Sequence, residues 1–282
     1  MSASLRNTIL LILMACTTFS CRTKKKASQS PDGYNLNAVS RQKLPLELDE
    51  ISGLAYYAKD SSVFAINDEK GWIYKLKKGR PIQRWRFSKG ADFEDLVLKD
   101  SVFYVLQSNG DINRLTFADD GAVQVQLFHF NAAEPGQNEF EILYFDSSKN
   151  KLMLICKDCE SDKKRSLTTF TFDPATGAYS DSSFSIDVTK IATAMGEEKL
   201  KFKPSAAAIN PRDGLLYIVS AINEMIVTTD LNGNFKSAYR IDGGVFKQPE
   251  GIAFTPSGSM MISNEAADVG VADILYFPYH KK

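Results

Sequence analysis

A strand–turn–strand pattern recurs along this chain and constrains its fold more than any other feature. Near the C-terminus it occupies residues 248–266, where two short apolar runs flank a turn at residues 256–258 and the second run ends at Asn264. Near the N-terminus the same arrangement begins at Glu50 and ends at Asp68. Self-similarity of this kind indicates a repeat fold.

Weaker copies lie between these two. The copies are anchored at Glu50, Glu94, Glu141, Ser205 and Glu250, with spacings of 44, 47, 64 and 45 residues. A period of about 40–50 residues with several short strands per repeat is typical of β-propeller blades. The one long interval requires an insertion, and residues 187–203 supply apolar side chains at helical spacing from Val188 to Met195. We expect a short helix there, either as a cap over a sheet edge or as a lid.

The number of candidate strands indicates five blades. The first four repeats supply four strands each, whereas the last supplies three before the chain ends. Residues 41–46 form one further candidate strand, and its addition to the last blade would leave no unpaired edge between first and last blades. We therefore predict an all-β fold, a five-bladed β-propeller of four-stranded antiparallel blades in residues 41–280. An N-terminal strand would complete the last blade and close the ring.

The first twenty residues are not expected to belong to this domain. Arg6 is followed by an apolar run at residues 9–15 and then by Cys21, as in a cleaved signal peptide. The stretch resembles the signal peptide of a bacterial lipoprotein, in which a cysteine becomes lipidated. We assign Cys21 to this role, with Cys16 or an ordinary secretory signal as the alternatives.

Residues 21–40 would then be the lipidated cysteine and a polar, flexible tether. The protein would contact a membrane through its N-terminal lipid. By resemblance to sorted lipoproteins, Arg22 after the cysteine favours the outer membrane of the cell envelope.

Composition excludes several classes of function. The 34 basic and 34 acidic residues balance, which argues against a nucleic acid held by phosphate contacts. The two histidines, His129 and His280, are predicted to lie away from the propeller axis, so a Ser-His-Asp triad is not expected. Apolar residues make up 44% of the chain, enough for a substantial core, and we expect a monomer.

Cys156 and Cys159 form the one cysteine pair outside the N-terminal region. In a cell envelope we expect a local disulfide. Free thiols, a redox motif and a zinc site remain as alternatives, although a redox motif would need a βαβ context and zinc a second ligand pair.

Antiparallel geometry brings the starts of the first strands and the ends of the second strands to one rim around the axis. The polar residues expected on this rim are Glu50, Asp68, Glu69, Glu94, Asn109, Glu141, Asp158, Ser205, Glu250, Asn264 and Glu265. Neighbouring carboxylates raise one another's pKa, and oxygen ligands of this type suit Ca²⁺ or Mg²⁺. Alternatively, the glutamates accept backbone hydrogen bonds and fix the blades, with basic side chains such as Lys157, Lys203 and Lys247 neutralising them.

Three motifs carry a family resemblance: EISGLA from Glu50, FEDL from Phe93 and QPEGIAF from Gln248. On these motifs, residues 44–278 resemble the SdiA-regulated (YjiK-like) family of bacterial β-propeller proteins. Related phrases occur in esterase-like phytases and in lactonase and paraoxonase-type propellers. The resemblance implies Ca²⁺ or another divalent ion in the funnel, with Glu50, Glu250 and Asn264 at matching positions. The chain departs from the pattern at Ser205, where a carboxylate is usual, and at Asp95, where glycine is usual.

These observations define the candidate site. The candidate metal ligands are Glu50, Glu94, Glu141, Glu250 and Asn264, and the candidate ligand-binding residues are Asp68, Glu69, Asn109, Asp158 and Glu265. We expect a binding module that captures a small ligand or partner at an acidic central funnel, with Ca²⁺ as the candidate cofactor of this funnel. The alternatives are a divalent-cation-dependent hydrolase of an ester, lactone or phosphoester, and a scaffold whose glutamates only hold the blades.

Overall fold

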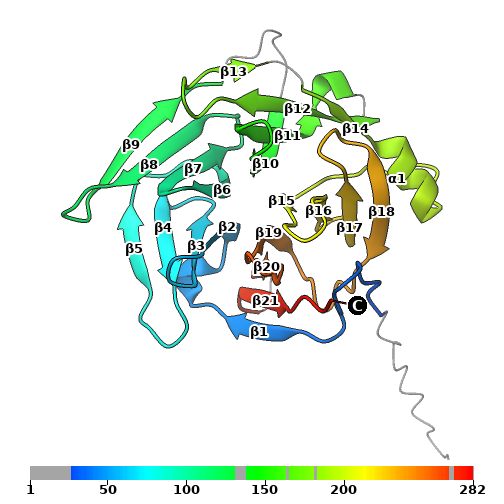
Figure 1. The fold of residues 1–282 in the computed structure, drawn as a ribbon, viewed down its shortest axis with the longest axis horizontal. Helices are drawn as coiled ribbons and strands as arrows, with labels where there is room; N and C mark the ends of the chain where they lie inside the picture. Colours follow the sequence, from blue (N-terminus) through cyan, green and yellow to red (C-terminus); the bar gives the residue numbers. More distant parts are fainter. Residues whose placement is uncertain (1–26, 131–137, 163–164, 181–182, 267–269, 282) are drawn as a thin grey trace, which may run out of the picture.

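The computed structural model describes residues 27–130, 138–162, 165–180, 183–266 and 270–281. The described strands form five antiparallel sheets arranged in a ring (Figure 1). The innermost strands contact one another in the cyclic order β2, β6, β10, β15, β19 and back to β2. The predicted all-β, five-bladed propeller is therefore confirmed. The expected signal peptide and Cys21 lie outside the described residues.

Each blade is a meander from the axis outward. The first blade contains β2 (Ile51–Tyr57), β3 (Ser62–Asn67), β4 (Trp72–Leu76) and β5 (Gln83–Arg86), preceded by the short 3₁₀ helix η1 (Leu46–Leu48). The second contains β6 (Phe93–Lys99), β7 (Val102–Gln107), β8 (Ile112–Phe117) and β9 (Val123–Phe128). The fourth contains β15 (Ala206–Ile209), β16 (Leu216–Ser220), β17 (Met225–Thr229) and β18 (Phe235–Arg240).

The third blade differs from the predicted four strands at its outer edge. It contains β10 (Asn138–Asp146), β11 (Lys151–Cys159), the short 3₁₀ helix η2 (Glu160–Asp162), β12 (Ser166–Phe172), β13 (Tyr179–Ser180) and β14 (Ser185–Asp187). Both β13 and β14 pair with β12, at its two ends. The outer edge is therefore divided between two short strands.

The fifth blade contains β19 (Pro249–Phe254), β20 (Met260–Asn264) and β21 (Asp273–Phe277). Its outermost strand is β1 (Ser40–Lys43), which pairs antiparallel with β21. The strand comes from the N-terminal side of the domain, near the predicted residues 41–46.

The core is distributed over the interfaces between blades. Within the described residues, each pair of neighbouring blades encloses one cluster of buried apolar side chains. The second strands are buried on both faces because they lie between two such clusters; β3, β16 and β20 are buried at every position. This explains the continuous apolar runs in these strands.

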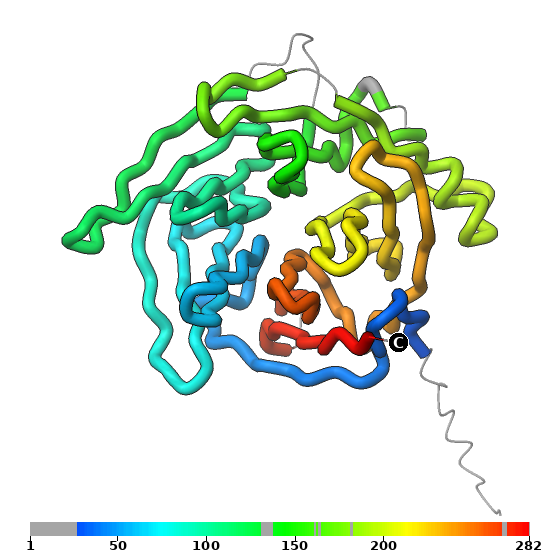
Figure 2. The backbone as a smooth tube through the Cα atoms, viewed as in Figure 1, coloured from blue at the N-terminus to red at the C-terminus, as the bar shows by residue number. Residues whose placement is uncertain are grey.

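The chain before β1 is packed rather than forming the flexible tether expected for residues 21–40. Tyr34 and Leu36 are 7% and 0% exposed and belong to the cluster between the fourth and fifth blades. The Tyr34 hydroxyl donates a hydrogen bond to the Gly258 carbonyl over 2.6 Å. Figure 2 shows this segment in dark blue beside the end of the fourth blade. Two apolar side chains that precede residue 41 therefore pack into the core of the propeller.

The insertion between the third and fourth blades is the helix α1 (Val188–Met195). Asp187 caps it by accepting a hydrogen bond from the Thr189 amide, and Gly196 ends it with φ of 68°. Val188 and Ile191 pack into the cluster between these blades, and Figure 1 shows α1 at the periphery beside β18. The helix covers a sheet edge, and the alternative of a lid over the axis is wrong. No helix in the described part of the chain is long and apolar enough to cross a membrane.

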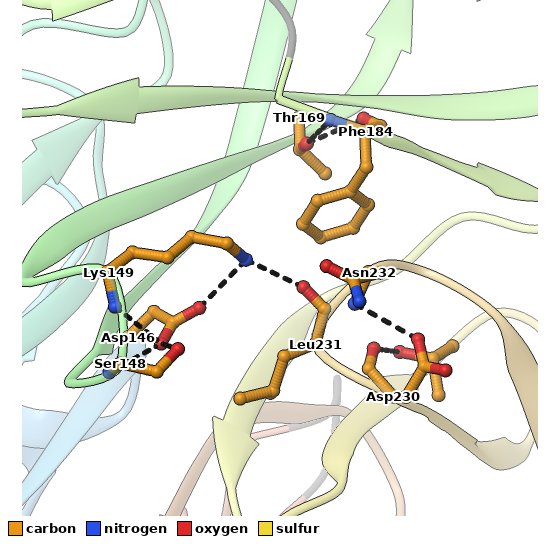
Figure 3. A network of polar contacts seen from close by, with 9 residues as sticks. Asp146, Ser148, Lys149, Thr169, Phe184, Asp230, Leu231 and Asn232 are labelled. Atoms are coloured by element: carbon orange, nitrogen blue, oxygen red, sulfur yellow. Dashed lines mark hydrogen bonds and ion pairs between the residues drawn. The ribbon is translucent and has the colours of Figure 1, made fainter.

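A polar network joins the third and fourth blades at the turns that follow β10 and β17 (Figure 3). Asp146 is fully buried and accepts hydrogen bonds from Ser148 and from the Lys149 ammonium, 2.9 Å away. The same ammonium donates to the Leu231 carbonyl over 2.8 Å and lies over the Phe184 ring. Lys149 thus connects a buried carboxylate in one blade to a turn of the next.

Candidate functional site

Three of the predicted glutamates occupy the same structural position in three blades. Glu94, Glu141 and Glu250 each lie at a register shift in the innermost strand, where the pairing with the second strand passes over them. A β-bulge of this kind turns a side chain out of the sheet's regular alternation. These bulges bring three carboxylates toward one another from the second, third and fifth blades.

Burial and mutual repulsion act on these three carboxylates. Burial, with repulsion from Glu141 and Asp92 as the next causes and Lys157 opposing them, raises the pKa of Glu94 to about 9. Burial followed by repulsion from Glu141 and Glu265 raises the pKa of Glu250 to about 8. Burial also raises the pKa of Glu141, although Lys157 opposes the shift. The three glutamates therefore share one electrostatic environment.

Two further predicted residues extend this cluster toward the first and fifth blades. Burial, with repulsion from Asp68, Glu50 and Glu141, raises the pKa of Glu265 to about 7. Burial, with repulsion from Glu50 as the next cause, raises the pKa of Asp68 to about 6. We call the six carboxylates the acidic funnel: Glu50, Asp68, Glu94, Glu141, Glu250 and Glu265. They come from every blade except the fourth.

One cation enters the acidic funnel from the third blade. The Lys157 ammonium pairs with Glu141 and lies 2.9 Å from a Glu139 carboxylate oxygen. Burial lowers the pKa of Lys157, but attraction to Glu141 and Glu139 outweighs burial and leaves the pKa above its usual value. At the funnel's edge Lys70 approaches Glu50 at 3.9 Å. The funnel therefore retains an excess of carboxylates.

Glu94 and Glu250 do not hold the blades together. Among the described residues, neither carboxylate has a hydrogen bond or an ion pair within 4 Å, and Oδ1 of Asp68 is buried without a hydrogen-bond partner. The alternative that the rim glutamates accept backbone hydrogen bonds therefore does not describe Glu94 and Glu250.

The bonds that join neighbouring blades come from other side chains. The Ser205 hydroxyl donates to the Pro249 carbonyl over 2.6 Å, from the fourth blade to the fifth. Asp95 accepts from the Leu143 amide, from the second blade to the third. These are the two positions at which the sequence departs from the family pattern. The structure shows that both have become connections between blades.

Four predicted residues lie apart from the acidic funnel or are engaged elsewhere. Asn264 is buried and donates to the Val245 carbonyl and to Asp273, so that only its Oδ1 lacks a partner. Asp158 is exposed and pairs with Lys203 at 3.2 Å. Glu69 and Asn109 are also exposed. The Glu69 side chain has no hydrogen bond to a described residue, and Asn109 accepts one from the Asp111 amide in its own turn. Of the candidate ligand-binding residues, Asp68 and Glu265 belong to the acidic funnel, and the charge of Glu69 acts on Asp68.

Cys156 and Cys159 are joined by a disulfide bond. With Asp162 they form the one group of potential metal-ligand atoms within 4.8 Å of one another in the described residues. The disulfide leaves no thiolates for a metal. Cys159 and Lys157 also line a cavity of about 190 Å³ beside the funnel.

The donor set of the acidic funnel fits a hard divalent cation. Every candidate ligand is a carboxylate oxygen, which Ca²⁺ and Mg²⁺ prefer. No three funnel carboxylates in the described part meet within 4.8 Å, which is the arrangement expected of like charges that repel. Side-chain rotation and water would complete a coordination sphere. Glu94, Glu141 and Glu250 are the residues that would hold the ion.

Comparisons with known proteins agree with this architecture. A family model described as SdiA-regulated matches residues 26–268, and a search of curated proteins found no match. Among solved structures, the glutaminyl cyclase of Myxococcus xanthus aligns with a TM-score of 0.55 and 14% identity, over 86% of this chain and 98% of that one. A glucose dehydrogenase aligns with a TM-score of 0.54 and 8% identity, over 86% and 100%. A luciferin-regenerating enzyme aligns with a TM-score of 0.52 and 11% identity, over 86% and 95%. At these identities the likeness concerns the fold alone.

Proposed function

The chain belongs to the SdiA-regulated family. Because its fold is shared with propellers of several activities, we propose its function from the site itself. We propose that it is a binding module. The acidic funnel holds a divalent cation, Ca²⁺ being the first candidate, and the cation presents its open positions to a small ligand or a partner.

One observation carries this proposal. Glu94 and Glu250 each lie at a bulge of an innermost strand, lack any hydrogen-bond or ion-pair partner in the described residues, and have a raised pKa. A carboxylate that stabilises a fold normally accepts hydrogen bonds when it leaves water. Carboxylates that destabilise one another instead are stabilised when a cation binds between them. The funnel is thus arranged for an external positive charge.

Each residue has a distinct part in this proposal. Glu94 and Glu250 supply the two unpartnered ligands, and Glu141 supplies a third that is shared with Lys157. Glu265 and Asp68 face the cation from the fifth and first blades and attract it from a distance. A bound cation would polarise an oxygen of the ligand.

The test is calorimetric titration of the protein with Ca²⁺ and Mg²⁺, together with thermal unfolding in chelator and in millimolar cation. We expect saturable binding, a higher unfolding midpoint with cation, and the loss of both in Glu250→Gln. Glu198→Gln is the matched control, because Glu198 is exposed in the loop after α1. Absence of binding and of any midpoint shift in the unmodified protein would refute the cation site.

A cation-dependent hydrolase is the second candidate. A cation in the funnel would polarise an oxygen of the substrate, and a rim carboxylate such as Glu50 would act as the general base. The protein should be tested with chromogenic esters, lactones and phosphoesters in Ca²⁺, with Glu250→Gln and chelator as controls. Turnover that both controls abolish would establish this activity, and its absence leaves the binding module.

We also propose that Cys21 carries a lipid that anchors the protein in the cell envelope, in the outer membrane. The basis is the signal-peptide pattern at residues 1–20. Labelling with a fatty acid should mark the unmodified protein but not Cys21→Ser, and Cys16→Ser should remain labelled. Labelling lost only in Cys16→Ser would move the anchor to that cysteine.

A further inference from the structure

Lys157 is held in an unusual way at the edge of the acidic funnel. It lies between Cys156 and Cys159, which are joined by a disulfide. The pairing of β10 with β11 passes from Cys156 directly to Asp158, so Lys157 occupies a bulge that is separated from the bulge of Glu141 by the single pair Phe140–Cys156. The ladder from β11 to β12 ends at Ile155. Beyond that residue, the described strand pairing of β11 is with β10 alone, and the disulfide links Cys156 to Cys159 within this part of the strand.

The bulge directs the Lys157 ammonium to the carboxylates rather than to water. Its side chain is 22% exposed, and the Glu141 side chain that it contacts is 7% exposed. The second contact is with Glu139 at 2.9 Å. Its charge also acts on Glu94 and Glu250, the two carboxylates that lack partners. One covalently attached cation therefore already occupies part of the site proposed above for a free cation.

We propose that Lys157 is the specificity-determining residue of the funnel: an internal cation, positioned by the Cys156–Cys159 disulfide, that competes with divalent cations for Glu141. The inference rests on the proposed cation site. It identifies Lys157 as the residue that sets the affinity of this site for divalent cations. Two positive charges within a few ångströms repel each other strongly where water is scarce. A divalent cation must displace Lys157 from Glu141 or bind against its repulsion.

The disulfide makes this position dependent on redox state. Reduction by a dithiol breaks the S–S bond; two electrons and two protons pass to the cysteines, giving two S–H groups, while the reagent becomes a cyclic disulfide. Cys156 is fully buried and Cys159 is 4% exposed, and Cys159 lines a cavity together with Lys157. Without the cross-link, the end of β11 keeps its irregular pairing with β10, the ion pair of Asp158 with Lys203 and the packing of the two cysteines in the core, but it loses a covalent restraint. Lys157 would then leave Glu141 more often, and the funnel would bind cations more tightly.

The first experiment tests the positioning without any cation. The rate at which an amine-acylating reagent modifies Lys157 is measured by mass spectrometry in the disulfide-bonded and the dithiol-reduced protein. Lys75 is the matched control, since it pairs with Asp60 at 2.8 Å, is 20% exposed and lies in the first blade. We expect the rate to rise several-fold at Lys157 and to stay constant at Lys75. Equal rates at Lys157 in both states would overturn the role of the disulfide.

The second experiment tests the competition by calorimetric titration with Ca²⁺. Lys157→Met should bind Ca²⁺ about tenfold more tightly than the unmodified protein because a neighbouring like charge is removed. Lys157→Arg, which keeps the charge, should not, and the reduced protein should fall between. Unchanged or weaker affinity in Lys157→Met would overturn the inference while leaving the cation site intact. Absence of Ca²⁺ binding in all of these proteins would overturn both proposals.

Discussion

Asp95 of β6 accepts a hydrogen bond from the Leu143 amide of β10, with 2.8 Å between Oδ2 and the nitrogen. Its Oδ1 accepts from the Leu96 amide at 2.7 Å. Asp95 is only 5% exposed, and burial raises its pKa well above the ordinary value even though both amides oppose the shift. A single side chain thus satisfies two buried backbone donors and joins the innermost strands of the second and third blades.

Asp95→Ala should therefore destabilise the propeller. The substitution leaves the Leu143 and Leu96 amides without an acceptor, and one buried unsatisfied donor costs about 1–3 kcal/mol. Chemical denaturation followed by tryptophan fluorescence measures the change. Asp119→Ala is the control, because Asp119 is exposed in the turn after β8 of the same blade and a surface substitution changes stability by about 0.5 kcal/mol or less. Equal stability of the two variants would contradict the role of Asp95.

The ion pair of Lys149 with Asp146 should contribute more to the free energy of unfolding than the ion pair of Lys236 with Asp230. Asp146 has a fully buried carboxylate, whereas Lys236 and Asp230 are 45% and 29% exposed. Lys149→Met should lower the free energy of unfolding by about 1–3 kcal/mol, since it leaves a buried acceptor without its charged donor. Lys236→Met should lower it by about 1 kcal/mol or less, as is usual for exposed pairs. Comparable losses, measured by urea denaturation, would show that burial does not distinguish them.

The sequence was sufficient to predict the number of blades and the equivalent positions of three glutamates in their blades. Both depend on local patterns: the repeat spacing around Glu94, Glu141 and Glu250, and the alternation of strands and turns. A closed ring then brings equivalent positions of its blades toward one axis, and in the structure the charges of Glu141 and Glu250 act on Glu94.

What the sequence could not indicate is how the inner strands use each polar residue. Asn264 and Glu265 are neighbours, yet strand alternation turns Asn264 to Asp273 within its own blade and Glu265 toward the funnel. The bulge at Glu141 and the neighbouring bulge at Lys157 depend on pairing between strands, which no local pattern specifies. Ser205 likewise reads as a missing carboxylate, although its hydroxyl connects two blades.

Tyr34 provides a test of the packed N-terminal segment. Tyr34→Phe removes the hydrogen bond to the Gly258 carbonyl and should cost about 0.5–1.5 kcal/mol. Tyr34→Ala also removes a 7% exposed ring from between the fourth and fifth blades and should cost about 3–5 kcal/mol. Thermal unfolding of the two variants gives the comparison. If Tyr34→Ala were as stable as the unmodified protein, residues 27–39 would be a tether after all.

Glu250→Gln should make the protein more stable and at the same time remove its cation binding. The pKa of Glu250 is raised from 4.5 to about 8 in the folded state, so the folded protein holds a proton here that the unfolded chain has released. Ionisation of Glu250 therefore costs no stability below pH 4.5, costs progressively more as the pH rises to about 8, and reaches its full cost above that pH.

The difference in unfolding free energy between Glu250→Gln and the unmodified protein should follow the same profile without cation. It should be near zero at pH 4 and up to about 5 kcal/mol in favour of the variant at pH 9, since the shift from 4.5 to about 8 is about 3.5 pKa units and one unit corresponds to about 1.4 kcal/mol. Saturating Ca²⁺ should reverse the order at pH 9, because only the unmodified protein binds it. A variant that is less stable at every pH would show that Glu250 supports the fold. Carboxylates kept at a cost to the fold are, in contrast, the signature of a site that serves a ligand.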